Sequence, residues 1–486
     1  MTKIRQKKIK IELFKEQETY TIYNGSMLDM LEVIEPNSID AIVTDPPYHL
    51  KSITERFGKE NSAPAKYGED GSFSRLSKGF MNQTWDGGDI AFRPETWRKC
   101  YEVLKPGGYL LAFGGSRTFH RMAVAIEDAG FEIRDTIMWL YGSGFPKGMN
   151  IGLAIDKKND IKSEIIASYE RYNEPSGIVN IGQGERKKVI HKVKKASNEW
   201  QGWGTALKPA YEPIIVARKP IEGTVVENVM KWGVGGLNID GCRIEGEPIQ
   251  VNVSFKKEIQ SEGWGTKRAN TELQNQGRFP ANVIHDGSEE VEGLFPQEAG
   301  GGSGTYDFTK TSQENTTHII TNIKSGHHFG DSGSASRYFY TAKASKKDRD
   351  EGLDGFEQMQ TTDGYIRNNE ESARKFGANS ALRRNIHPTV KPCELMQYLV
   401  RLVTPRGGIV LDPFMGSGST GKAVMFENRE RNADYKFIGI DLEEKYCQIA
   451  IARIDYALNK FEYDYIKEKQ EAEARGQANI FDFLEG

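Results

Sequence analysis

The feature that most constrains the fold is a glycine-rich turn near the C-terminal end of the chain. Residues 409–411 form a short apolar run typical of a buried strand, and residues 412–421 follow with three glycines before a helical segment begins. Glycine permits positive φ angles and a close backbone approach to a ligand, and the first turn of a helix presents unpaired N–H groups. Strand, turn and helix in this order predict an α/β protein with a ligand site at the turn.

Strands and helices alternate elsewhere in the chain. The segment 38–44 ends as a β-branched apolar run, and Pro94 opens a helical pattern that a Lys-Pro-Gly-Gly sequence stops. We also expect strands at 109–113, 131–139, 213–217 and 437–440 and helices at 117–129, after Pro392 and from about 443. This pattern predicts a doubly wound, mostly parallel sheet.

The alternation is interrupted in the middle of the chain. Residues 221–386 contain glycine-rich and polar stretches with few long periodic segments, which favours a separate inserted unit. Residues 156–200 have the character of a smaller insertion. We therefore expect residues 1–220 and 387–486 to form one split α/β domain around the insertion at 221–386.

Composition limits the cellular context. The formal net charge of −3, from 65 basic and 68 acidic side chains, gives no global basic field and taken alone speaks against a nucleic-acid partner. Residues 460–486 carry four basic and seven acidic side chains, so this acidic tail accounts for the whole deficit. The four cysteines form no metal-type or redox-type pair, and no long apolar run is present. We expect a cytoplasmic protein with no membrane segment and no metal.

A second strand end carries the sequence Asp45-Pro46-Pro47-Tyr48. Each proline lacks an N–H and has a fixed φ, so the Pro46 carbonyl is held rigidly as an acceptor beside the Asp45 carboxylate. Two acceptors suit an –NH₂ group with two donors, and the Tyr48 ring offers a face on which a heterocycle can stack. This motif predicts a site for the exocyclic amine of a base, where Asp45 stabilises the positive charge that develops on nitrogen.

The glycine-rich turn admits two ligand interpretations. Gly416, Gly418 and Gly421 satisfy G-x-G-x-x-G, and Asp441 lies 20 residues beyond Gly421 at the end of the next strand, where a carboxylate can bind ribose hydroxyls. This spacing permits an NAD-linked dehydrogenase. Asp412 in front of the glycines, however, would repel a pyrophosphate and favours a nucleoside with a cationic tail, such as S-adenosylmethionine.

Taken together, the two motifs resemble those of the DNA amino-methyltransferases, which methylate adenine N6 or cytosine N4. Residues 45–48 match the catalytic motif and 411–420 the cofactor motif of that family, with His387-Pro388-Thr389-Val390-Lys391-Pro392 between them. The order resembles the permuted β class, in which a target-recognition domain, here 221–386, lies between two parts of a Rossmann-like catalytic domain.

The resemblance implies a set of functional residues. The implied catalytic residues are Asp45, Pro46, Pro47 and Tyr48; the implied cofactor-binding residues are Asp412, Pro413, Phe414, Gly416, Ser417, Gly418, Thr420, Asp441, His387, Pro388 and Lys391. Ser26 replaces the acid that usually ends the first strand of the family, and it is not included in this set. The implied cofactor is S-adenosylmethionine and the implied partner is double-stranded DNA, from which the target base is flipped out.

Asp45 as the first residue of its motif favours adenine N6, with cytosine N4 as the alternative. Cytosine C5 chemistry needs a thiolate beside the prolines, where Tyr48 stands instead. An amine on RNA or on a protein glutamine, or a DNA-binding protein without activity, are further interpretations. The recognised DNA sequence, a homodimer and a cognate restriction endonuclease are left open by the sequence.

Overall fold

The structure is a computed structural model of the 486-residue chain. It describes residues 12–47, 89–144, 148–172, 188–245, 277–297, 333–342, 346–362 and 380–460, together with the short strands 66–67, 73–74, 249–251, 272–274 and 365–366. Within this described part, no helix combines the length and apolar character needed to cross a bilayer.

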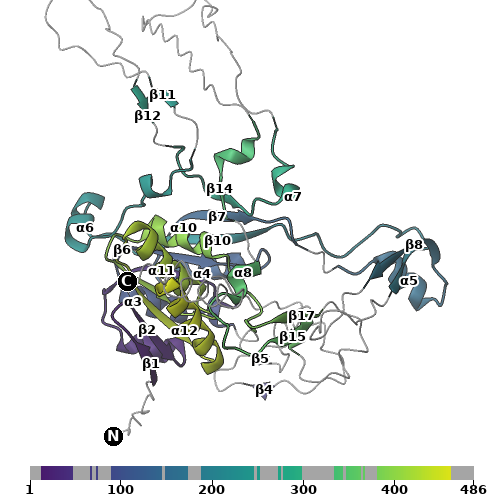
Figure 1. The fold of residues 1–486 in the computed structure, drawn as a ribbon, viewed down its shortest axis with the longest axis horizontal. Coiled ribbons are helices and arrows are strands. Elements are labelled where there is room, and N and C mark those ends of the chain that lie inside the picture. Colours follow the sequence, from purple (N-terminus) through teal and green to yellow (C-terminus); the bar gives the residue numbers. More distant parts are fainter. Residues whose placement is uncertain are drawn as a thin grey trace, which may run out of the picture.

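A ten-stranded sheet organises the chain (Figure 1). Its strands are, in spatial order, β1 (Glu12–Glu16), β2 (Tyr20–Asn24), β19 (Lys436–Asp441), β18 (Ile409–Asp412), β3 (Ile39–Thr44), β6 (Leu104–Phe113), β10 (Tyr211–Arg218), β7 (Glu132–Leu140), β13 (Val283–His285) and β14 (Tyr340–Thr341). The strands from β2 to β6 are parallel to one another, and so are β7, β13 and β14. The predicted mostly parallel α/β sheet is confirmed.

One strand in the middle of the sheet runs the other way. β10 is antiparallel to both of its neighbours, β6 and β7, and at the sheet edge β1 is antiparallel to β2. Since β10 is reversed, its first residues lie at the same edge as the last residues of β3, β18 and β19. Side chains at the start of β10 therefore reach the edge where open α/β sheets bind ligands.

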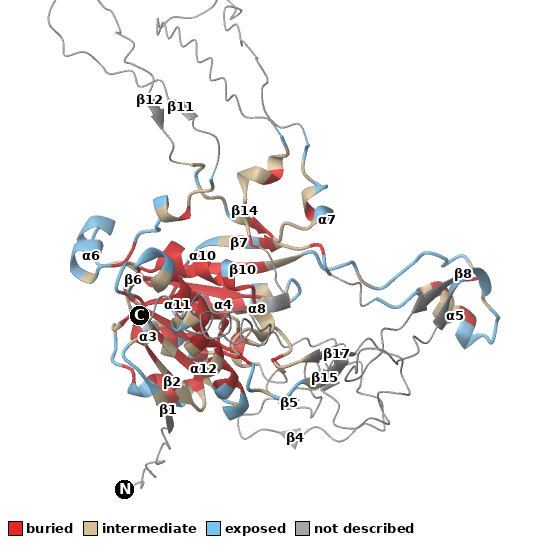
Figure 2. Cartoon of the chain, viewed as in Figure 1, coloured by how far each residue is buried: buried red, intermediate tan, exposed pale blue. Residues whose placement is uncertain are grey.

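Helices cover both faces of the sheet, as the doubly wound prediction requires. α10 (Cys393–Val403), α11 (Ser419–Arg431) and α12 (Glu444–Leu458) pack on one face, and α1 (Met27–Met30), α3 (Pro94–Val103) and α4 (Phe119–Asp128) on the other. Alternate residues of β6 serve the two cores, with Leu111 and Phe113 in the first and Leu110 and Ala112 in the second. The buried residues concentrate in these layers (Figure 2).

β6 differs from its predicted bounds. It begins at Leu104, directly after α3, whereas the sequence places the strand at 109–113 after a break. Leu104 already pairs with Ile39 of β3, and the positive φ of Gly107 (+82°) takes up the irregularity inside the strand. Residues 105–108 therefore form an irregular stretch inside β6, where the register against β3 shifts between the Ile39–Leu104 and Ala41–Tyr109 pairs.

Parts of residues 221–386 pack directly on the α/β sheet. β13 and β14 extend the sheet beyond β7. In addition, Asp348 of α8 (Lys346–Asp350) accepts a hydrogen bond from Lys422 of α11 at 2.5 Å. These contacts attach β13, β14 and α8, which all lie within residues 221–386, to the sheet and to α11.

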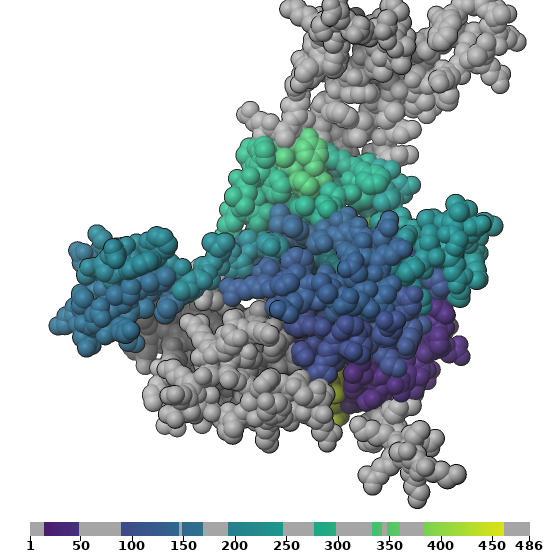
Figure 3. All heavy atoms as spheres, turned by 180° about the vertical axis from the view of Figure 1, so that it is seen from behind, coloured from purple at the N-terminus to yellow at the C-terminus, as the bar shows by residue number. Residues whose placement is uncertain are grey.

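The smaller insertion forms an arm, defined here as residues 148–208. It contains α5 (Ile151–Lys158) and a hairpin of β8 (Glu164–Tyr172) and β9 (Lys188–Lys195). It leaves the sheet between β7 and β10 through a narrow neck, where the Ile151 N–H donates to the Trp203 carbonyl at 3.0 Å and Asn150 bridges Gly204. In the view from behind, the arm projects from the body at the left in blue and teal (Figure 3).

Candidate active site

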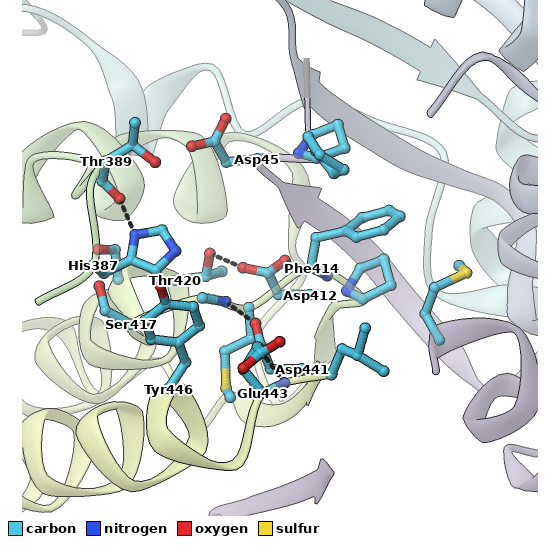
Figure 4. A pocket seen from close by; sticks show the side chains of 18 of the residues that line it. Asp45, His387, Thr389, Asp412, Phe414, Ser417, Thr420, Asp441, Glu443 and Tyr446 are labelled. Carbon is cyan, nitrogen blue, oxygen red and sulfur yellow. Dashed lines mark hydrogen bonds between the residues drawn. The ribbon is translucent and has the colours of Figure 1, made fainter. Parts of the chain in front are cut away.

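A pocket of about 320 Å³ lies at the edge where β3, β18 and β19 end and β10 begins (Figure 4). A volume of this size is within the range of small-molecule sites. Of the residues that the sequence analysis selected, those lining the pocket are Asp45, Pro46, Pro47, His387, Lys391, Asp412, Pro413, Phe414, Gly416, Ser417, Thr420 and Asp441. The two predicted strand-end sites thus share one pocket.

Three selected residues are not part of this lining. Tyr48 lies outside the described residues. Gly418 caps α11 with a φ of +75°, and a Cβ there would come within 2.7 Å of Ala450, so its smallness permits close packing of α11 on α12. Pro388 uses its carbonyl to accept a hydrogen bond from Arg349 at 3.1 Å.

Asp412 joins the two strand ends beneath the pocket. Its carboxylate accepts hydrogen bonds from Thr44 Oγ1 at 2.7 Å, Thr420 Oγ1 at 2.6 Å and the Phe414 N–H at 3.2 Å. Burial raises its pKa to about 6, against the opposing effect of these bonds. Since Thr44 immediately precedes Asp45, Asp412 fixes the Asp45-Pro46-Pro47 segment relative to the glycine-rich turn.

His387 packs against the glycine-rich turn in its neutral form. Burial lowers its pKa to about 4, and its Nδ1 donates to the Thr389 carbonyl at 2.5 Å, which leaves Nε2 without a proton. Gly416 has a φ of +55°, and a Cβ at this position would lie 2.8 Å from Nε2. Glycine is therefore required at 416 both by the backbone conformation and by the imidazole.

Asp441 lies at the end of β19 and stabilises the conformation of the glycine-rich turn. Its two oxygens accept from the backbone N–H groups of Gly416 and Glu443, each at 2.8 Å. Burial raises the pKa of Asp441 to about 7, and the Asp412 carboxylate adds to this effect. Each carboxylate oxygen still has a second lone-pair direction with which it can bind hydroxyl donors from a ligand.

The pocket carries an excess of negative charge. Among the described residues that line it, five bear carboxylates and one bears an ammonium group; the acids are Asp45, Glu212, Asp412, Asp441 and Glu443, and the base is Lys391. The raised pKa values of Asp412 and Asp441 mean that a cation in the pocket would relieve an existing electrostatic cost. This largely acidic lining, with its carboxylate acceptors, fits a nucleoside with a positively charged tail.

Lys391 faces the catalytic motif rather than the glycine-rich turn. Its Nζ donates to Asp45 Oδ2 at 2.6 Å, lies 3.2 Å from Glu212 Oε2 and sits 4.8 Å from the centre of the Phe113 ring. Burial alone would lower its pKa, but the carboxylates of Asp45 and Glu212 reverse this and raise it. Lys391 is therefore a charged ammonium at neutral pH.

Glu212 is a pocket residue that the sequence analysis missed. It lies at the start of β10, and burial raises its pKa while Lys391 opposes the shift. Sequence patterns point to the ends of parallel strands, and Glu212 reaches the same edge only because β10 is reversed. Ser26, Glu443 and Tyr446 also line the pocket without having been selected.

A buried arginine supports the glycine-rich turn from behind. Arg453 of α12 is fully buried and donates to the Ser417 carbonyl at 2.6 Å and to Ser417 Oγ at 3.0 Å. It also donates to the Asp348 carbonyl at 3.2 Å, with the Asp348 carboxylate 3.7 Å away. Sequence periodicity predicts a long helix here but gives no sign that its arginine points inward.

Fold and pocket define an α/β protein of the doubly wound type with a ligand pocket at the carboxyl edge of its sheet. The family model described as DNA methylase matches residues 39–452 of the chain. The chain belongs to this DNA methylase family. The match covers both motifs, the arm and the whole middle segment.

Individual relatives match over part of the chain. The type II methyltransferase M.HindIII of Haemophilus influenzae is 25% identical over 232 residues, covering 45% of this chain and 64% of that protein. The type II methyltransferase M2.LlaDCHI of Lactococcus lactis subsp. cremoris is 26% identical over 236 residues, covering 46% of this chain and 81% of that protein. The match thus spans less than two thirds of the length of M.HindIII.

Solved structures give a distant likeness. The PvuII DNA methyltransferase (cytosine-N4-specific) is 13% identical, with 92% of this chain and 97% of that one covered, at a TM-score of 0.38. The M1.HpyAVI–SAM complex is 14% identical, with 90% and 98% covered, at a TM-score of 0.32. At these scores the likeness carries no argument about the site.

Proposed function

We propose that the protein is an S-adenosylmethionine-dependent DNA methyltransferase that methylates N6 of adenine. The observation that carries the proposal is the 2.7 Å hydrogen bond from Thr44 to Asp412, which joins the Asp45 motif to the glycine-rich turn. It brings an acceptor for an amine and a site for a cationic nucleoside into one pocket. Family membership supports the same reaction class.

The chain's own residues are suited to hold the cofactor. Asp441 would accept hydrogen bonds from ribose hydroxyls, the turn around Gly416 lets a ligand approach the backbone, and the Phe414 ring lines the pocket as an apolar surface. S-adenosylmethionine supplies, when bound, an electrophilic methyl group carried by a sulfonium. The acidic lining favours that positive charge.

Asp45 and Pro46 are suited to hold the amine of the base. Their carboxylate and carbonyl oxygens accept its two N–H bonds, which draws the nitrogen lone pair out of conjugation with the ring and orients it for attack. Asp45 then stabilises the positive charge that develops on nitrogen, and the surplus proton leaves to solvent. Neither a metal nor a covalent enzyme intermediate enters this scheme.

Adenine is favoured over cytosine by the acid at the first position of the motif. A relative of 38% identity over 71 residues is the DNA adenine methyltransferase YhdJ of Escherichia coli, which supports this choice, and that match covers 15% of this chain. Cytosine N4 is the alternative, because the same two acceptors suit either amine.

The substrate would be duplex DNA, since the family is one of DNA methylases. A base inside a duplex must be rotated out of the stack to reach a pocket of this kind. We assign recognition of the DNA sequence to residues 221–386 and stacking on the base to Tyr48, which lies outside the described residues. The relatives are named type II methyltransferases, which supports a role for this protein alongside a restriction endonuclease. We place the protein in the cytoplasm.

The test is transfer of a labelled methyl group to unmethylated DNA, followed by digestion to nucleosides. We expect label in N6-methyl-2′-deoxyadenosine, and none with Asp45→Ala. Label in N4-methyl-2′-deoxycytidine would replace adenine by cytosine. Incorporation by Asp45→Ala equal to that of the wild type would refute the role of Asp45, and tight binding of NAD without binding of S-adenosylmethionine would refute the reaction class.

A further inference from the structure

Three side chains from separate elements form one ionic cluster in the pocket. Asp45 follows β3 and Glu212 opens β10, and β6 lies between these strands with Phe113 at its end. Two strand spacings separate β3 from β10, about 10 Å. The Lys391 ammonium spans that gap above the Phe113 ring, 2.6 Å from Asp45 Oδ2 and 3.2 Å from Glu212 Oε2.

The cluster sets the charge that faces the reacting amine. Asp45 and Lys391 alone would form a neutral pair, and such a pair stabilises a developing cation far less than a lone carboxylate does. In its ionised form, which the Lys391 ammonium favours against the effect of burial, the Glu212 carboxylate restores one net negative charge. Its side chain lines the pocket, and among the described residues Oε2 is buried beside Lys391 at 3.2 Å without a hydrogen bond of good geometry.

We propose that Glu212 is a positioning residue that shares the Lys391 ammonium with Asp45 and keeps the cluster at one net negative charge during methyl transfer. This inference rests on the proposed function. It assigns Glu212 no contact with the methyl group or the base; Glu212 acts through Lys391. The arrangement leaves the Asp45 carboxylate in the pocket lining, where it can accept a hydrogen bond from the amine.

A purely structural ion pair between Glu212 and Lys391 would respond differently to substitution. If Glu212 only stabilised the fold, loss of its charge would lower the melting temperature, and the loss of Lys391 as well would add further damage. If Glu212 balances charge, the relevant quantity is the net charge of the cluster formed by Asp45, Lys391 and Glu212. This charge is 0 without Glu212, −2 without Lys391 and again −1 without both. The double variant should then be more active than Glu212→Gln.

The experiment compares the full-length wild type with Glu212→Gln, Lys391→Met and the double variant. The kcat and KM for DNA methylation are measured, together with the ratio of calorimetric affinities for S-adenosylmethionine and its neutral thioether product, S-adenosylhomocysteine. For Glu212→Gln we expect kcat to fall on the order of tenfold, with the KM for DNA little changed and the sulfonium-to-thioether ratio reduced. The double variant should recover part of both losses.

The control is Glu132→Gln, which removes a carboxylate of β7 that lies beside the far end of β10 from Glu212. Glu132 of β7 accepts from Arg218 of β10 at 2.7 Å, so the substitution changes a similar pair outside the pocket. Its kcat and affinity ratio should match the wild type. Thermal unfolding of every variant shows that the compared proteins are folded.

The outcomes separate the two proposals. Glu212→Gln with wild-type kcat and affinity ratio, or a double variant no more active than Glu212→Gln, overturns the charge-balancing role. A wild type that binds S-adenosylmethionine but methylates no DNA refutes the proposed function. In that case the affinity ratio alone decides the role of Glu212, because it needs no DNA.

Discussion

Lys391 Nζ lies 2.6 Å from Asp45 Oδ2, although 346 residues separate the two in the chain. The acid of the catalytic motif is thus engaged by a residue that the sequence analysis placed with the cofactor. The contact holds the loop after β3 against the segment before α10, at the point where we expect the reaction to occur.

Asp45→Asn should abolish most turnover while the protein stays folded. The amide keeps the size of the side chain and one acceptor oxygen but loses the negative charge, and Lys391 retains Glu212 as a partner. Loss of one such stabilising group costs on the order of 10²–10³ in kcat. Single-turnover methylation and calorimetric binding of S-adenosylmethionine measure the two properties separately. Turnover within a few-fold of the wild type would contradict the assigned role.

Ionisation of Asp412 and Asp441 should lower the stability of the ligand-free protein as the pH rises from about 4 to about 7, against a smaller opposing contribution from His387, whose pKa is lowered from 6.5 to about 4. Burial raises the pKa of Asp412 to about 6 and of Asp441 to about 7, from ordinary values of 3.8. In this window the folded state keeps protons that the unfolded chain has released, so the free energy of unfolding falls with rising pH. Below the window both states are protonated, and the cost is absent.

Thermal unfolding over this pH range checks the prediction. Asp441→Asn should flatten the decline, because residue 441 then no longer titrates. S-adenosylmethionine should stabilise the wild type more at pH 8 than at pH 5, since its positive charge offsets ionised acids. A wild type and an Asp441→Asn variant with parallel pH profiles would disprove the link to this residue.

Gly416→Ala should weaken binding of the cofactor as well as the fold. The residue has a φ of +55°, and its Cβ would lie 2.8 Å from His387 Nε2, so the imidazole or the turn must move. Gly407→Ala is a matched control, with a φ of +75° and no atom within 4 Å of the place that its Cβ would take. The left-handed backbone costs each variant about 1–2 kcal/mol.

Calorimetry separates the two effects. Only Gly416→Ala should bind S-adenosylmethionine more weakly, by at least about tenfold, which is 1.4 kcal/mol. Equal affinities for both variants would show that contact with His387 does not set the shape of the turn.

Arg453→Met should destabilise the protein far more than loss of an exposed arginine. Arg453 is fully buried and donates to the Ser417 carbonyl and hydroxyl, so its removal takes a buried donor from Ser417, while Asp348 keeps its contact with Lys422. Leaving a buried acceptor without its donor costs about 1–3 kcal/mol, and the loss of the buried guanidinium packing adds to this.

The comparison is Arg406→Met. Arg406 pairs with Asp434 at 3.0 Å, with both side chains largely exposed. We expect less than about 1 kcal/mol from its loss. Denaturant-induced unfolding gives both values, and similar losses for the two variants would argue against a supporting role for Arg453.

The sequence predicts the α/β class, most of the strands and helices around the two motifs, and the pairing of the motifs in one pocket. These features follow from local signals: apolar runs of strand length, prolines and glycines at element ends, and carboxylates directly after strands. The parallel direction of β3 and β18 also follows, since both are strands of a doubly wound sheet.

The missed residues depend on relationships that no local pattern contains. Glu212 enters the pocket because β10 runs against its neighbours, and nothing within Tyr211–Arg218 indicates strand direction. Arg453 points inward because Ser417 and Asp348, from two distant segments, meet beneath α12. Lys391 lies in the motif at 387–392, but its contacts with Asp45 and Glu212 depend on the strand order of the sheet. β3 and β10 are only two strands apart in that order.

Because the two ends of the arm meet at the neck, the length of the arm has little effect on the free energy of folding. The chain leaves and returns at adjacent points, where Met149 N–H donates to Thr205 Oγ1 at 2.8 Å. A segment whose ends are already joined can double in length for about 0.6 kcal/mol of closure entropy. The arm can therefore differ in length while Glu212, only a few residues beyond the neck, keeps its place in the sheet.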